Sequence, residues 1–93
     1  MIDQRRTVQD VLIERLQTIQ SISEVTAEHM RLVQKQSGMQ VMDMAEQDDP
    51  AITREIDRTD GALESCKEQI GALEQQLAQL DEELEAKVEG GKT

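Results

Sequence analysis

The sequence predicts an all-α fold, an antiparallel hairpin of two long helices with coiled-coil packing, completed into a helical bundle by oligomerisation or by a partner. Three observations lead to this prediction. The second half of the chain repeats apolar residues in alternating steps of four and three, a proline interrupts the helical pattern near the middle, and the 93 residues include no Phe, Tyr or Trp. A short chain without aromatic side chains buries only a small core by itself, so helix packing is the expected source of stability.

The second half carries the clearest pattern, because its apolar and small residues follow the a and d positions of a heptad repeat for about five heptads. These positions are Ile52, Ile56, Thr59, Leu63, Cys66, Ile70, Leu73, Leu77, Leu80 and Leu84. We predict a helix over 50–89, followed by a frayed tail over 90–93 that begins with two glycines. Asp49 is a suitable N-cap, and Pro50 fits the first helical position, where its missing N–H costs nothing.

The first half predicts a less regular helix over 3–45. One apolar line along it comprises Val8, Leu12, Ile19, Ile22 and Val33, and a second line beside it recurs at sevens through Val11, Val25, Leu32 and Met39. Leu16 and Met30 flank these lines, and so broad a stripe indicates a helix that touches more than one neighbour. Gly38 costs about 1 kcal/mol relative to alanine, which makes it the weakest point of this helix.

We place a turn at 46–49, because the residue before a proline is disfavoured in the helical conformation. A reversal there brings Arg5, Arg6 and Arg15 beside an acidic tract in the second helix. The tract consists of Glu74, Asp81, Glu82, Glu83, Glu85 and Glu89. A parallel pair of second helices would instead bring two such tracts together at the negative ends of the helix dipoles. Charge therefore favours the antiparallel hairpin.

The formal net charge of −10 argues against phosphate-mediated binding of nucleic acid, and the missing aromatic residues remove base stacking. No apolar run approaches the roughly 20 residues of a membrane-spanning helix, and the opening MIDQRR lacks the apolar segment of a signal peptide. Cys66 is the single cysteine, so no internal disulfide can form. We expect a soluble cytoplasmic protein without nucleic-acid binding or membrane insertion, with export that needs no cleaved signal left open.

Three methionines, Met39, Met42 and Met44, stand close to the predicted turn. Thioethers can bind Cu(I), but methionine also fills irregular gaps, such as those expected where two helices meet a turn, and can adapt to a partner. We prefer the packing interpretation and predict neither a metal nor a cofactor.

His29 and Cys66 are the residues that come closest to a nucleophilic pair, and they lack both a third orienting group and a cleft. A polar layer that fixes the helical register is the better interpretation of His29, together with Thr26 and Thr59. We therefore predict no catalytic residue, no enzymatic activity and no small-molecule substrate.

These observations favour a non-enzymatic coiled-coil assembly or scaffold protein that binds itself as a homo-oligomer or binds another helical protein. The predicted interface consists of Leu12, Ile19, Ile22, Val33, Ile56, Leu63, Ile70, Leu73, Leu77, Leu80 and Leu84. The alternative is a secretion-related helper (a chaperone) or a secreted helical filament subunit, in which an apolar groove receives a partner helix. A remote alternative is Cu(I) binding through the three methionines.

Overall fold

Two α-helices that pack against each other form the fold, α1 (Val8–Ala45) and α2 (Pro50–Gly90). The computed structural model describes residues 6–45 and 49–90, and within those ranges it contains no strand. The predicted all-α helical hairpin is therefore confirmed.

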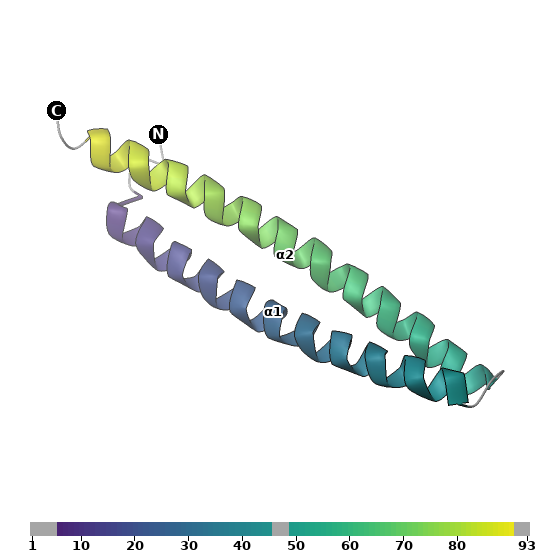
Figure 1. The fold of residues 1–93 in the computed structure, drawn as a ribbon. Coiled ribbons are helices and arrows are strands. Elements are labelled where there is room, and N and C mark those ends of the chain that lie inside the picture. The colour runs from purple at the N-terminus through teal and green to yellow at the C-terminus, as the bar shows by residue number, and fades with distance from the viewer. Residues whose placement is uncertain (1–5, 46–48, 91–93) are drawn as a thin grey trace. The chain divides into compact units, whose positions relative to one another are not determined.

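Contacts divide the chain into two units, and the boundaries between them fall inside both helices. Unit 1 comprises residues 1–23 and 71–93, and unit 2 comprises residues 24–70. In unit 1 the beginning of α1, purple in Figure 1, lies beside the end of α2, which is yellow. In unit 2 the teal end of α1 lies beside the start of α2.

Helix α1 begins at Val8, whereas the sequence pattern predicted a start at Asp3. Residues 1–5 lie outside the described part of the chain, and Arg6 and Thr7 precede the helix. The reason for the later start is a capping box, in which the Thr7 N–H donates to Asp10 Oδ2 at 3.0 Å and the Asp10 N–H donates to Thr7 Oγ1 at 3.0 Å. The two bonds satisfy backbone donors that a helix start leaves without partners.

Helix α2 begins as its sequence predicts. The Ala51 N–H donates to Asp49 Oδ1 at 2.9 Å, so Asp49 is the N-cap and Pro50 the first helical residue. The helix ends at Gly90, one residue later than predicted. Of the predicted turn 46–49, residues 46–48 lie outside the described part of the chain.

Gly38 does not end α1, which continues to Ala45. The next residue, Met39, is buried in unit 2, and the Thr59 hydroxyl of α2 donates to its sulfur at 3.7 Å. Packing against a neighbouring helix supplies most of the stability of a helix in a protein, and here it outweighs the cost of one glycine.

In each unit one line of residues on each helix is buried or half-buried, and we name these lines the facing rows. The facing rows of unit 1 are Val11, Arg15, Thr18 and Ile22 on α1, and Leu73, Leu77, Leu80, Leu84 and Lys87 on α2. Steps of four and three keep each row on one side of its helix. Val11 and Leu80 are the most deeply buried apolar side chains of this unit, at 0% and 4% exposure.

The facing rows of unit 2 continue the same spacing. They are Val25, His29, Leu32, Gln36, Met39 and Asp43 on α1, and Ile52, Ile56, Thr59, Leu63, Cys66 and Ile70 on α2. Thr59 is buried and His29 half-buried, but Thr26 is exposed and does not belong to the polar layer predicted for it. Its place one residue after Val25 turns it about 100° away from the facing row.

Replacing Thr7 by alanine removes half of the capping box, so we expect Thr7→Ala to lower the free energy of unfolding by about 1 kcal/mol. Thermal unfolding followed by circular dichroism measures the change. Thr26→Ala is the matched control, because Thr26 is exposed inside the helix and we expect no loss there. Equal losses in both variants would contradict the cap.

The same box predicts a pH dependence. The hydrogen bond from the Thr7 N–H, followed by that with the Thr7 side chain, lowers the pKa of Asp10 below its usual value. A lowered folded-state pKa means that the cap stabilises the fold above the unfolded pKa and that this contribution disappears as the pH falls through the folded pKa. Asp10→Asn removes the titrating carboxylate, so the stability difference between wild type and Asp10→Asn should shrink on acidification below about pH 4.

Leu80→Ala tests the packing of unit 1, because Leu80 is 4% exposed. Truncating a buried leucine costs about 2–5 kcal/mol. Val88→Ala serves as the control at 46% exposure in the same unit, and we expect it to cost less than about 1 kcal/mol. Urea unfolding of both variants measures the difference, and similar midpoints would show that Leu80 does not pack as described.

Candidate protein-interaction surface

Ion pairs join the two helices in unit 1. Arg6 Nε lies 2.7 Å from Glu83 Oε2, and Arg15 Nε lies 2.6 Å from Asp81 Oδ1. Arg6, which precedes α1, also pairs with Glu14 of that helix at 2.5 Å. The pairing predicted between the first arginines and the acidic tract is therefore confirmed for Arg6 and Arg15, whereas Arg5 lies outside the described residues.

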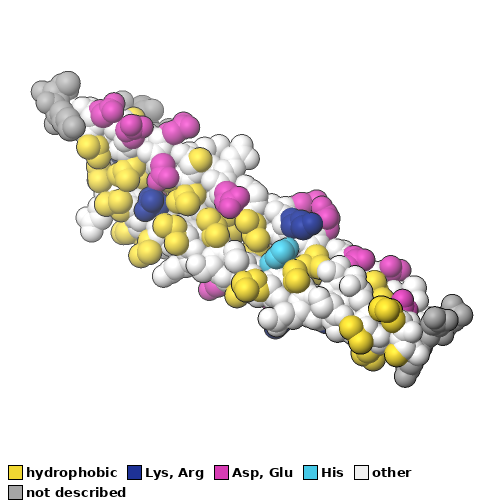
Figure 2. All heavy atoms as spheres, in the orientation of Figure 1, with side chains coloured by type: hydrophobic (Ala, Val, Ile, Leu, Met, Phe, Trp, Pro, Cys, Tyr) yellow, Lys and Arg dark blue, Asp and Glu magenta, His cyan; other side chains and the backbone are white. Residues whose placement is uncertain are grey.

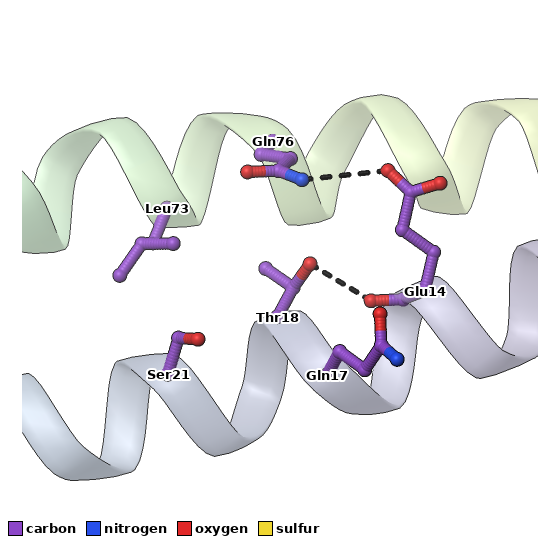
Figure 3. A pocket seen from close by; sticks show the side chains of 6 residues that line it. All are labelled: Glu14, Gln17, Thr18, Ser21, Leu73 and Gln76. Atoms are coloured by element: carbon purple, nitrogen blue, oxygen red, sulfur yellow. Dashed lines mark hydrogen bonds between the residues drawn. The ribbon is translucent and has the colours of Figure 1, made fainter.

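A shallow polar pocket of about 150 Å³ lies on one side of unit 1 (Figure 3). Its lining consists of Glu14, Gln17, Thr18, Ser21, Leu73 and Gln76. The Thr18 hydroxyl donates to the Glu14 carbonyl oxygen at 2.9 Å, and Gln76 Nε2 donates to Glu14 Oε2 at 3.4 Å. Glu14 is the one ionisable residue in this lining and is already paired with Arg6. The Glu14 carboxylate thus binds Arg6 and Gln76, while the Thr18 hydroxyl donates to a backbone carbonyl and not to that carboxylate.

The hydrogen bond between Glu14 and Gln76 shows which residues share a side of unit 1. Each of them comes one residue before a member of a facing row, Arg15 and Leu77 respectively. Positions one residue before the facing rows therefore meet on one side of the helix pair. Positions one residue after the facing rows must turn to the opposite side, since each residue rotates a helix by 100°.

We name the α1 residues that come one position after the facing row the outer row. In unit 1 the outer row comprises Leu12, Leu16, Ile19 and Ser23. Leu12 and Leu16 are 46% and 57% exposed, and no member of the row is charged. Figure 2 shows hydrophobic side chains close together where the beginning of α1 lies beside the end of α2.

The outer row of unit 2 has the same character. It comprises Thr26, Met30, Val33, Ser37, Gln40 and Met44, again without a charge. Met30, Val33 and Met44 are exposed. Within each unit, α1 thus presents one row to α2 and a second uncharged row to its surroundings.

The predicted interface residues divide between these surfaces. Leu63 and Leu80 are buried, the half-buried ones are Ile19, Ile22, Ile56, Ile70, Leu73, Leu77 and Leu84, and the exposed ones are Leu12 and Val33. All the predicted α2 residues belong to facing rows. On α1 only Ile22 does, while Leu12, Ile19 and Val33 belong to the outer rows.

Sequence reasoning did not assign Val11 and Thr18 to the predicted interface, although both are buried in unit 1. It also treated Leu16 as a flank. A usable signal was present, because Val11, Val25, Leu32 and Met39 recur at sevens. Thr18 completes that series and falls at the one position where the apolar pattern is broken.

The three methionines do not gather on one side of α1. Met39 is buried, whereas Met42 and Met44 are exposed. Residues two apart on a helix do not face each other, so the helix does not gather Met42 and Met44 at one point.

Met39 and Met42 instead line an apolar pocket of about 300 Å³ in unit 2. The other lining residues are Lys35, Ala51, Ile52 and Glu55. Gly38 is exposed and does not belong to this lining.

Comparison with protein-family models, with curated proteins and with solved structures found no match to this chain. Neither described helix contains a segment long and apolar enough to cross a membrane. Among the residues in 6–45 and 49–90, no three His, Cys, Asp or Glu side chains form a group that could hold a metal ion.

The ion pair between Lys35 and Glu55, two residues that line the methionine pocket, lowers the pKa of Glu55, and this shift can be tested. The hydrogen bond from Lys35 Nζ to Glu55 Oε1, at 3.1 Å, is the main cause that lowers the pKa of Glu55, and the charges of Lys35 and Arg58 add to it. We expect Lys35→Gln to raise the Glu55 pKa toward its ordinary value, measured by carbon-13 NMR titration of the carboxyl group. Arg58→Gln is the control and should produce a smaller change.

The lowered pKa of Glu55 determines how the stability of the fold changes with pH. The Lys35–Glu55 interaction stabilises the fold above the unfolded glutamate pKa, about 4.3, and is lost as the pH falls through the folded pKa. Wild type should therefore lose more stability on acidification than Lys35→Gln. An unchanged Glu55 titration in Lys35→Gln would contradict the pair.

Proposed function

We propose that this chain is a non-enzymatic assembly or scaffold protein that acts through helix–helix contacts, with the outer rows of α1 as the binding surface. The observation that carries this proposal is the outer row of α1, which is uncharged although the facing row of the same helix already packs on α2. A helix that buries only one face normally shows charged and polar residues on its remaining surface.

The spacing of the outer row supports a helical partner. Leu12, Leu16 and Ile19 follow steps of four and three, which is the pattern through which one helix packs on another. A bundle of helices is the ordinary way to cover two adjacent faces of one helix. Exposed apolar surface of this kind marks interaction sites in soluble proteins.

The free energy gained by covering the outer row of unit 1 alone is modest. Full burial of a leucine stabilises by about 1.5–3 kcal/mol, and Leu12 and Leu16 are each about half exposed, so covering both contributes roughly that amount. Association costs several kcal/mol in lost translational and rotational freedom. A stable complex therefore needs the neighbouring residues of the face as well as the row.

The double variant Leu12→Asp plus Leu16→Asp tests the proposal in cells that naturally make the protein. We expect the wild-type chain to elute in an assembly larger than the monomer and the variant to leave that assembly, because charged residues at a helix interface cost several kcal/mol when buried. Size-exclusion chromatography with chemical crosslinking measures the change.

The control is Gln17→Asp plus Gln20→Asp, which adds the same charge to exposed positions of α1 in unit 1 outside the outer row. This control should remain in the assembly, and circular dichroism should show unchanged helicity in both double variants. A monomeric wild type, or equal loss of assembly in both variants, would contradict the proposed function.

A further inference from the structure

We propose that the outer row of unit 1 receives a basic amphipathic helix of another protein rather than a second copy of this chain. The inference rests on the proposed function and specifies the chemistry of the partner. It is carried by the charges that border the outer row.

The border comes from α2. The bond between Glu14 and Gln76 shows that positions one residue before the facing rows meet on one side of unit 1. The α2 residues one position after the facing row therefore turn to the other side, which is the side of the outer row. We name the α2 residues on this side the acidic border, comprising Gly71, Glu74, Ala78, Asp81, Glu85 and Val88. Figure 2 shows Asp and Glu side chains beside the hydrophobic ones at this end of the helix pair.

Of the three acids in the border, Asp81 is paired with Arg15, whereas Glu74 and Glu85 have no compensating positive charge in the part of the unit that the structure describes. The described part of unit 1 carries eight acidic residues against three basic ones, Arg6, Arg15 and Lys87. Arg6 and Arg15 are already paired with acids of the same unit. Among the described residues of unit 1, neither Glu74 nor Glu85 forms an ion pair.

A second copy is the poorer occupant for the same reason. It would bring another chain with a net charge of −10 and the same acidic border to the interface. Like charges that face each other across an interface oppose association, whereas a complementary charge increases the association rate and selects the partner. Lys and Arg beside the apolar stripe of a partner helix would pair with Glu74 and Glu85.

The length of the row sets the size of the partner. Leu12 to Ser23 spans eleven residue steps of helix, about 17 Å at 1.5 Å per residue. A partner helix of about four turns covers this distance, with leucines in steps of three and four and basic residues on either side of them.

The experiment uses the purified full chain and two synthetic helical peptides of identical leucine pattern. One peptide carries lysines beside the leucines and the other carries glutamates. Fluorescence anisotropy measures binding, and sedimentation equilibrium of the chain alone measures self-association. We expect the lysine peptide to bind at least tenfold more tightly than the glutamate peptide, with an affinity that falls as salt is added.

Two pairs of variants locate the binding. Leu12→Asp plus Leu16→Asp should weaken lysine-peptide binding at least tenfold, whereas Gln17→Asp plus Gln20→Asp, which adds equal negative charge, should not weaken it. Glu74→Gln plus Glu85→Gln should weaken binding several-fold. Glu82→Gln plus Glu89→Gln removes the same charge two positions after the facing row, away from the border, and should have a smaller effect.

The outcomes separate the inference from the proposed function. Self-association of the chain that depends on Leu12 and Leu16, together with no lysine-peptide binding, would overturn the basic-helix partner and leave the assembly function standing. Peptide binding that is equal in the two aspartate variants would place the peptide elsewhere and also overturn the inference. No association of any kind that depends on Leu12 and Leu16 would overturn both.

Discussion

The packing of the α1 facing rows on α2 is the interaction on which the other features of this protein depend. A helix rotates by 100° per residue, so the choice of Val11 and Thr18 as inward residues in unit 1 also fixes Leu12 and Ile19 as the residues beside them on an adjacent side. A register shifted by one residue would turn the outer row toward α2 and move the present facing row to the opposite side of the pair. The candidate interaction surface is therefore a consequence of the intramolecular register.

Ionic and polar contacts between the helices hold that register. In unit 1, Arg15 of the α1 facing row reaches Asp81, and in unit 2 the amide of Gln36 donates to Asp60 at 2.6 Å. Each exposed pair contributes little to stability, about 0–1 kcal/mol, but a shift by one residue would separate all of them at once. Polar residues in a facing row thus lower the gain from apolar burial and specify one alignment.

The presence of polar residues in the α1 facing rows explains why one helix was easier to predict than the other. The α2 seam was predictable residue by residue, because its Leu and Ile positions keep one spacing and α2 offers no competing apolar line. The α1 row was not, because its inward positions include Arg15, His29 and Gln36 while Leu12 and Leu16 lie outside it. Hydrophobicity alone identified two neighbouring lines on α1, and only the contacts with α2 show which one is inward. The start at Val8 depended on the Thr7–Asp10 capping box, a local hydrogen-bond pattern that apolar spacing does not contain.

The facing rows pack within the hairpin and the outer rows are largely exposed, so mutations to charged residues should affect the two kinds of row differently. The leucine seam of α2, the caps at Thr7 and Asp49 and the inter-helix pairs stabilise the hairpin, and among the outer-row residues only Ile19 is half-buried. An apolar residue that adds nothing to folding and remains exposed lowers solubility, so a row without a binding role would be expected to acquire charges by mutation. In both units every outer-row position lacks a charge, although charged residues make up 32% of the chain. That contrast is better explained by a partner that excludes charge from the row than by packing within the hairpin.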